Sequence, residues 1–219
     1  QITRQKMDSW KAYQWRRDRH QRWAERRIMK ALADQVAPAL EAIRSDPKQA
    51  IGSLPYLIQT TPVEAAYQDL YARVGSDFAE RTARMMKAED AWIEHMRAFA
   101  TTRAGERIRR VTQTTLSRVR AVLEQGVREG WGVDVMAERI ARSNAVNLIR
   151  ARVIARAEII SASNEGSMTG ARSTGLQLNK VWLATADERT RDTHRAIGGT
   201  SVAMNGKFMV GGFKGDYPG

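Results

Sequence analysis

Apolar residues between positions 63 and 99 recur at helical spacing, and this long stripe constrains the fold more than any other feature of the sequence. Successive members lie three, four or seven positions apart, so they line one face of an α-helix. Thr61, Pro62 and Glu64 form a start signal, with Thr61 as N-cap and Glu64 as its capping-box partner. We therefore predict one long member of a bundle or coiled coil, ending near residue 99. The stripe consists of Val63, Tyr67, Leu70, Val74, Phe78, Met85, Trp92, Met96 and Phe99.

Other stretches also have helical periodicity. Residues 104–129 carry a second apolar face and end at Gly130, a natural stop, so this helix should form an antiparallel hairpin with the preceding one. Residues 44–62 contain several prolines and glycines and are predicted to be a break, with Pro38 ending or kinking the helix before it. Further helices are predicted at 3–37, 134–142, where Asp134 is a candidate cap, and 146–174.

The pattern changes after Gly175. Residues 178–185 alternate between apolar and polar side chains, which predicts a strand, and the glycine-rich remainder predicts brief strands and turns. The fold class is therefore α+β and mainly α, with a hairpin or bundle-like arm of long helices before a small C-terminal module with short strands. We predict a basic N-terminal helical arm at 1–43, a long-helix hairpin region at 44–145 and an α+β module at 146–219. Because the first residue is Gln, we expect a fragment of a longer protein, with a truncated C-terminal module.

Positive charge is concentrated in two blocks. The net charge is +12, and arginines outnumber lysines by 28 to 8. Arginine forks onto phosphates and carboxylates, which favours a polyanion or an acidic protein surface as partner, although a solvated basic surface would have the same composition. The candidate contact residues are Arg16, Arg17, Arg19, Arg22, Arg26 and Arg27 in the first block and Arg103, Arg107, Arg110 and Arg118 in the second.

Composition excludes several classes of site. The chain has no cysteine, so it forms neither a disulfide framework nor a cysteine zinc site. Its three histidines, His20, His95 and His194, have no metal-ligand spacing, and we assign no metal and no cofactor. No apolar run approaches the roughly 20 residues that a membrane span needs. No helix-turn-helix, zinc or RNA-binding motif supports a cellular nucleic-acid-binding protein, the third class of function considered.

The most informative motif lies between residues 154 and 219. Arg156-Ala157-Glu158 is followed on the same predicted helix by Ala162, Asn164, Gly166 and Gly170, then by a strand containing Trp182 and Thr185. Asp187, Arg189, Arg191 and His194 come next, ahead of Phe208 and a Tyr217-Pro218-Gly219 end. This arrangement resembles the phage head morphogenesis family typified by the phage Mu F-like minor head protein, although Ala157 stands where the family pattern has Thr.

The resemblance implies a minor capsid protein of a tailed bacteriophage that acts in head assembly and genome delivery. Its implied partners are the portal protein and packaged double-stranded DNA, bound without sequence preference, with the major capsid or scaffold protein as further candidates. The implied location is the capsid interior near the portal vertex, after assembly in the host cytoplasm, with several copies per virion and no membrane in the assembled head. The family is structural, so we expect no enzymatic activity.

The motif residues themselves allow two interpretations. In the first they form a structural polar cluster, in which Glu158 pairs with Arg189 or Arg191 and Asp187 caps a helix at 188–197. In the second they form a small nuclease or toxin-like site, with His194 as general acid/base and the arginines holding a phosphate. Simple phosphate or partner binding by the same arginines is also open. The structural cluster would contain Glu158, Asn164, Trp182, Thr185, Asp187, Arg189, Arg191 and His194, and the enzyme site all of these except Asn164 and Trp182.

Overall fold

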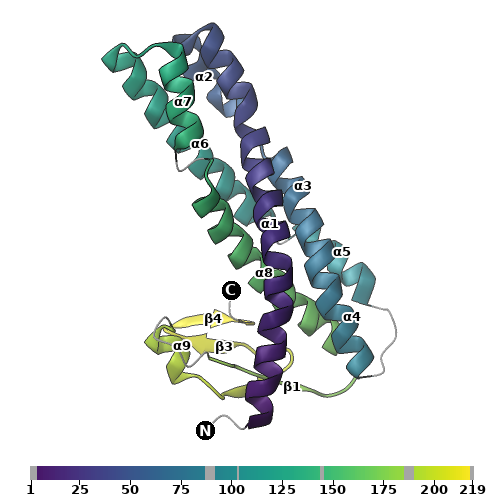
Figure 1. Ribbon diagram of the computed structural model, residues 1–219. Helices are drawn as coiled ribbons and strands as arrows, with labels where there is room; N and C mark the ends of the chain where they lie inside the picture. The colour runs from purple at the N-terminus through teal and green to yellow at the C-terminus, as the bar shows by residue number, and fades with distance from the viewer. Residues whose placement is uncertain (1–3, 87–91, 103, 144–145, 185–189, 218–219) are drawn as a thin grey trace. The chain divides into compact units, whose positions relative to one another are not determined.

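The computed structural model describes residues 4–86, 92–102, 104–143, 146–184 and 190–217, which are mainly helical, with a few short strands near the C-terminus (Figure 1). This confirms the predicted mainly α member of the α+β class. The helical elements are α1 (Arg4–Ser45), α2 (Pro47–Leu57), α3 (Thr61–Leu70), the π-helical turn η1 (Tyr71–Gly75), α4 (Ser76–Met85), α5 (Trp92–Thr102), α6 (Ala104–Glu129), α7 (Val133–Arg142), α8 (Leu148–Arg172) and α9 (Asp192–Ala196). The strands are β1 (Asn179–Val181), β2 (Ser201–Ala203), β3 (Phe208–Val210) and β4 (Phe213–Gly215).

The predicted helix across residues 63–99 is wrong in its continuity. The structure has α3, η1 and α4 up to Met85, and α5 begins at Trp92. Met85 belongs to the predicted stripe but is 72% exposed, so the stripe no longer meets a core where α4 ends. The start also differs, because Thr60 occupies the N-cap position and makes no side-chain capping bond. The periodicity of the sequence identified the buried face of these helices. It did not reveal that this face is no longer covered by other helices where α4 ends.

The predicted break at 44–62 is also wrong over much of its length, because it contains α2. The Asp46 carboxylate accepts hydrogen bonds from the backbone N–H groups of Lys48 (2.9 Å) and Gln49 (3.1 Å), and Pro47 begins the helix. Proline is well tolerated at a first helical position, where its missing N–H would have no partner. In the same way α1 continues through Pro38, since Ala39 and Ile43 behind it are fully buried and packing offsets the proline's cost.

The chain forms two compact units, each built from separated stretches. The first unit contains Gln1–Arg19, Arg73–Met96 and Ile160–Gly219, and the second contains His20–Ala72 and Arg97–Ile159. Helices α1 and α8 contribute residues to both units, because each is longer than one unit.

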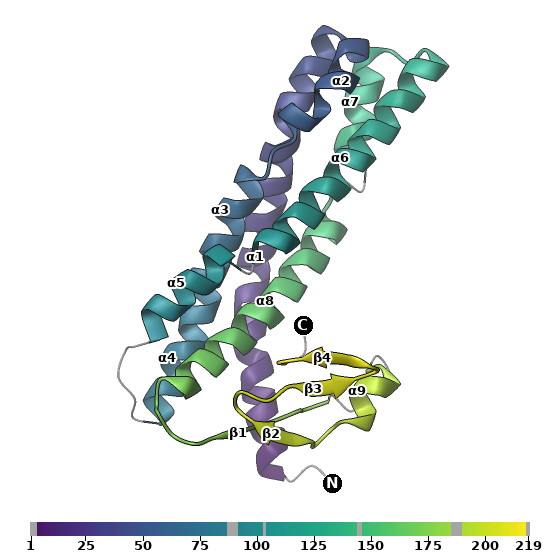
Figure 2. The same cartoon turned by 180° about the vertical axis from the view of Figure 1, so that it is seen from behind.

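The second unit has an aliphatic core shared by α1, α2, α6 and α7. Figures 1 and 2 show α2, α6 and α7 side by side from both directions. Gln35 is buried beside this core, and its amide donates to the Gln59 carbonyl (2.6 Å) and to the Thr112 hydroxyl (2.9 Å). The buried cluster consists of Val36, Ala39, Ile43, Ala50, Leu54, Ile58, Val119, Leu123, Met136 and Ile140.

The first unit depends on close approach between α8 and the η1–α4 segment. A Cβ atom on Gly166 would lie 2.2 Å from the Gly75 carbonyl oxygen, and one on Gly170 would lie 2.3 Å from the Ala79 carbonyl oxygen. Both distances are too short for a real carbon, so only glycine allows the two backbones to come this near. The N-terminal part of α1 also packs here, with the Tyr13 ring edge-on to Phe78 at 4.6 Å.

The strands form two antiparallel pairs within the first unit. Strand β1 pairs with β2, and β3 pairs with β4. The β3–β4 turn is made by Gly211 and Gly212, whose φ angles of 54° and 86° are the positive values that a tight two-residue hairpin requires. Helix α9 starts at Asp192, later than the predicted residue 188.

Within the described part of the chain, no helix combines the length and the apolar character needed to cross a bilayer.

Glycine-dependent packing gives a stability prediction. Gly166→Ala should lower the free energy of unfolding by about 1–3 kcal/mol or more, because α8 must move away from Gly75. Gly52→Ala is the matched control: Gly52 lies inside α2, where an added Cβ meets no atom within 4 Å, and should gain about 0.5–1 kcal/mol. Urea unfolding followed by circular dichroism measures both, and an unchanged Gly166→Ala variant would contradict the close contact.

Candidate functional site

Trp182 is the centre of the part of the C-terminal module that contains β1–β4 and α9, to which the name C-terminal module refers from here on. It follows β1 and is 3% exposed, with its ring edge-on to His194 (5.3 Å) and to Phe208 (5.1 Å). Its backbone extends the β1–β2 pairing, donating to the Thr200 carbonyl at 2.9 Å and accepting from the Gly199 N–H at 2.8 Å. His194 is therefore held between its own short helix α9 and a buried tryptophan ring.

Lys180 is a buried cation beside this aromatic group. Its Nζ atom lies 3.6 Å from the Asp216 carboxylate and 5.5 Å from the centre of the Phe208 ring. Burial lowers the pKa of Lys180, while the charge of Asp216 opposes that change. The pairing ties β1 to the segment that follows β4, so Lys180 has a structural role.

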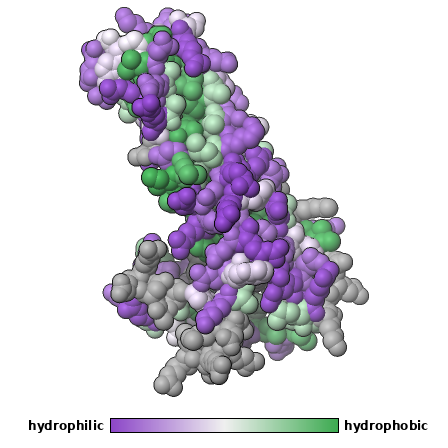
Figure 3. Space-filling view, in the orientation of Figure 1, coloured by the Kyte–Doolittle hydropathy of each residue, from purple (hydrophilic) through white to green (hydrophobic). Residues whose placement is uncertain are grey.

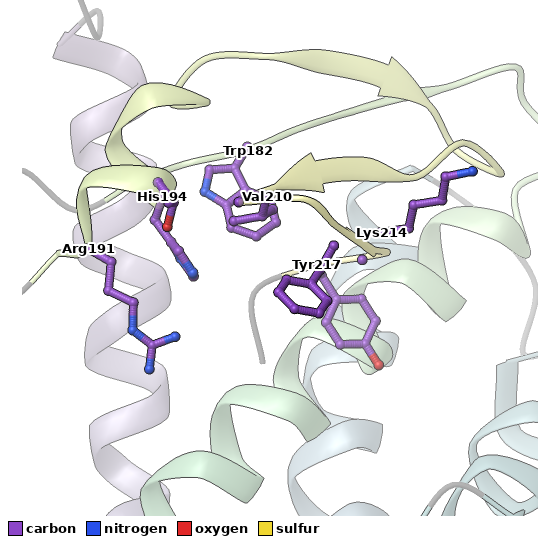
Figure 4. A pocket seen from close by; sticks show the side chains of 10 residues that line it. Trp182, Arg191, His194, Val210, Lys214 and Tyr217 are labelled. Atoms are coloured by element: carbon purple, nitrogen blue, oxygen red, sulfur yellow. The ribbon is translucent and has the colours of Figure 1, made fainter.

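A cavity of about 420 Å³ opens in the same module (Figure 4). Figure 4 shows Arg191 and His194 on one side and Tyr217 on the other, whereas the amine of Lys214 points away from them. The lining residues are Trp182, Arg191, Thr193, His194, Val210, Gly211, Phe213, Lys214, Gly215 and Tyr217.

The described lining of this cavity offers the Arg191 guanidinium to an anionic group. Among the residues that the structure describes, the lining contains cationic and aromatic side chains and no carboxylate. The Tyr217 hydroxyl donates a hydrogen bond to the Glu165 carboxylate at 2.7 Å, so its proton is already used in a structural contact. General acid–base catalysis needs a second proton-transferring group within hydrogen-bond reach of the reacting atoms. Among the residues that the structure describes, no three histidine or acidic side chains gather in a way that would hold a metal ion.

The structure keeps Trp182 and His194 of the predicted polar cluster in contact and gives Glu158 and Asn164 other partners. Glu158 pairs with Arg107 and Tyr71 in the second unit; of its two predicted partners, Arg191 belongs to the first unit and Arg189 is not described. Asn164 lies in the first unit, where its Oδ1 atom accepts from Arg17 Nη2 at 2.6 Å. The six positions between Glu158 and Asn164 turn their side chains about 120° apart on α8, so they meet different neighbours. The remaining predicted members Thr185, Asp187 and Arg189 lie outside the described residues.

The group around Glu158 is buried and was not foreseen from the sequence. Glu158 is 4% exposed, and its carboxylate accepts from the Tyr71 hydroxyl at 2.8 Å and from Arg107 Nη1 at 3.3 Å. Burial raises the pKa of the neighbouring Tyr67, and the charge of Glu158 raises it further. Burial is the largest single effect on Arg107 and would lower its pKa, but the charge of Glu158, the hydrogen bond to it and the nearby Tyr71 and Tyr67 together outweigh burial, and the net change is upward. Such a paired buried charge fixes how the helices align.

A second buried carboxylate, Glu165, anchors the end of the chain. It is 5% exposed and accepts from the Tyr217 hydroxyl, with His95 Nε2 and Arg172 Nη1 each 3.6 Å away. Sequence reasoning noted Tyr217 as part of the C-terminal motif but missed Glu165. The available signal was an acidic residue inside a helix surrounded by small and apolar residues, which has to find a partner once buried.

Three of the six candidate arginines of the first basic block have polar partners inside the chain. Arg16 pairs with Asp77 at 2.5 Å and Arg27 with Asp69 at 2.6 Å. Arg17 donates to the Ser163 hydroxyl and to Asn164, and burial lowers its pKa. These three predicted contact residues therefore stabilise the helices.

Of the second block, Arg107 and Arg110 are also paired, the latter with Glu106 at 2.5 Å. Arg118 is half-buried, and its charge contributes to the lowered pKa of Arg150, although burial is the larger cause. Arg103 lies outside the described residues.

The remaining three arginines are exposed on one helix. Arg19, Arg22 and Arg26 follow Trp15 along α1 at steps of four, three and four positions, which places all four on one face. Trp15 is 62% exposed, and the Arg19 guanidinium lies 5.1 Å from the centre of its ring. We call Trp15, Arg19, Arg22 and Arg26 the α1 basic face.

Comparisons with known proteins agree with the motif. Residues 117–215 match the family described as Phage Mu protein F like protein. The chain is also similar to minor head protein GP7 of Bacillus phage SPP1, with 30% identity over 107 residues that make up 48% of this chain and 35% of that protein. The chain thus spans about a third of this relative's length. No solved structure matches the chain significantly. The predicted resemblance to the phage head morphogenesis family is confirmed.

The aromatic group predicts where the C-terminal module is sensitive. Trp182→Ala should cost about 3–5 kcal/mol, because it removes the ring between His194 and Phe208 and leaves a cavity. Phe213→Ala is the matched control, since that ring is 80% exposed, and it should change stability by less than about 0.5 kcal/mol. Thermal unfolding and limited proteolysis of residues 176–217 compare the two. Equal sensitivity of both variants would show that Trp182 is not the centre of the module.

Proposed function

We propose that this chain, which matches the Mu F-like family over residues 117–215, is a structural minor head protein that binds packaged DNA through the α1 basic face and binds the portal. The observation that carries the DNA-binding part is the exposure of Arg19, Arg22 and Arg26 on one side of α1, while their neighbours in sequence are paired within the fold.

The geometry of the α1 basic face suits a duplex. Seven positions of helix separate Arg19 from Arg26, about 10 Å at 1.5 Å per residue. Duplex DNA carries one charge per about 1.7 Å of its axis, so arginines spread over this length reach several phosphates. Trp15 supports the guanidinium of Arg19 through a cation–π contact and leaves its N–H groups available to an anion. Contacts of this kind are independent of sequence, as packaging of a whole genome requires.

The portal-binding part rests on the family. The relative from Bacillus phage SPP1 bears the name minor head protein, and a protein present in few copies per head is suited to the unique portal vertex. We place this protein in the capsid interior near that vertex, where it would take part in assembly and genome delivery. A structural role is favoured over a nuclease, because His194 packs against Trp182 and the described residues that line the cavity beside it include no carboxylate.

The DNA-binding proposal predicts a specific loss of affinity. Replacing Arg19, Arg22 and Arg26 together with Gln should weaken binding to random-sequence duplex. It should also reduce the slope of log K against log salt by about 2–3, at about 0.9 for each lost phosphate contact. Fluorescence anisotropy over a series of salt concentrations measures both quantities.

The control removes the same charge from elsewhere. Arg84, Arg110 and Arg142 are also exposed, and each is paired with a glutamate four positions earlier on its own helix. The Gln variant of these three should keep the wild-type salt slope. If both triple variants lose affinity to the same degree, net charge and not the α1 basic face governs DNA binding.

A further inference from the structure

The beginning of α8 presents an unusual group of exposed aliphatic side chains. Leu148, Ile149 and Val153 are 52%, 72% and 64% exposed, within six consecutive residues. Figure 3 shows apolar side chains gathered on the surface where α8 begins. Single exposed aliphatic residues are common on proteins, but a group of them on one helix is typical of an interaction site.

The surrounding contacts fix the direction in which this group points. Arg150 donates to the Val111 carbonyl (2.9 Å) and the Thr115 hydroxyl (3.0 Å) of α6, and Arg152 pairs with Glu25 of α1 at 3.2 Å. Ala151 and Ala155 are fully buried on the inner side. Because α8 is held on both flanks and behind, the outward orientation of Ile149 and Val153 is set by the fold.

Positive charge borders the aliphatic group. Residues 146–157 contain no acidic side chain, and Arg156 is exposed one helical turn after Val153. On the neighbouring α1, Arg22 and Arg26 are exposed within one turn of Glu25, the residue that Arg152 contacts. The α8 docking face, defined as Leu148, Ile149, Val153 and Arg156, is therefore apolar along its centre and basic along its edge.

We propose that the α8 docking face binds an amphipathic helix of a partner protein whose apolar stripe is bordered by aspartates and glutamates. Ile149 and Val153 lie one turn apart, the spacing at which a partner helix presents its own anchors. A second copy of this chain fits poorly, because it would bring like charges together. A duplex would leave the three aliphatic side chains without apolar partners. The inference rests on the proposed function in one respect: the portal subunit is taken as the first candidate for the protein that contains this partner helix.

The chemistry is tested first with synthetic helices. One peptide carries leucines at i, i+3, i+4 and i+7 with glutamate flanks, and the other has the same leucines with lysine flanks. The protein should bind the glutamate peptide by fluorescence polarisation, and Ile149→Asp and Val153→Asp should each weaken binding about tenfold. Val135→Asp is the control, since Val135 is an exposed aliphatic residue (42%) on α7, and it should bind as wild type. Arg156→Glu should shift preference toward the lysine peptide.

Several results would overturn the inference: no binding of the glutamate peptide, no preference between the peptides, or equal losses for Val135→Asp and Ile149→Asp. Tighter binding to anionic phospholipid vesicles than to the glutamate peptide would assign the face to a membrane surface instead. Circular dichroism must show that each variant is folded, which the exposure of the substituted side chains favours.

The same variants are then measured against the purified portal protein of the phage that encodes this chain. Binding that Ile149→Asp weakens and Val135→Asp does not would support both proposals. Portal binding that all variants retain would overturn the docking face and leave the portal role intact. Binding of the glutamate peptide without any binding of the portal would support the docking face and overturn the portal role.

Discussion

Close packing against α8 is the constraint on which the first unit depends. In the first unit Gly166 and Gly170 let the backbone of η1 and α4 approach to a distance that no side chain would permit. In the second unit Ala151 and Ala155 are fully buried on the same helix. Small residues give up the apolar area that a large side chain would bury, and they regain stability through dense contact with neighbouring helices. Because these positions face inward, the larger and charged residues of α8 are directed to specific partners or to solvent.

The buried carboxylates of α8 determine which neighbours those are. Glu158 accepts from Tyr71 and Arg107, and Glu165 accepts from Tyr217. An unpaired buried carboxylate is far more costly than a paired one, so each glutamate penalises any other alignment of the helices around it. Tyr71 lies in the π-helical turn, and Tyr217 close to the end of the chain. The π-helical turn and the segment after β4 are thus each held by a glutamate of α8, whereas Ile149 of the same helix is exposed at the surface.

The sequence was informative where local signals decide the structure. Periodicity and the stop at Gly130 predicted α6, and the Mu F-like motif located Trp182 and His194. Prediction failed where distant contacts decide: α2 forms because Ala50 and Leu54 are buried, despite the prolines around them. The partners of Glu158 are 87 and 51 positions away, beyond the reach of any local pattern. Charge counting could not separate Arg17, which is half-buried among polar partners, from the exposed Arg19 two positions later.

Native-state hydrogen exchange tests most directly whether α8 is the element that organises the fold. Amides in the most stable part of a protein exchange only when the whole molecule unfolds, whereas peripheral elements open locally. The account predicts that residues 159–171 of α8 exchange at the global unfolding limit, far more slowly than those of α9 in the C-terminal module. Exchange of residues 159–171 as fast as that of α9 would contradict it, because the helix that all its neighbours contact would then be opening independently of them.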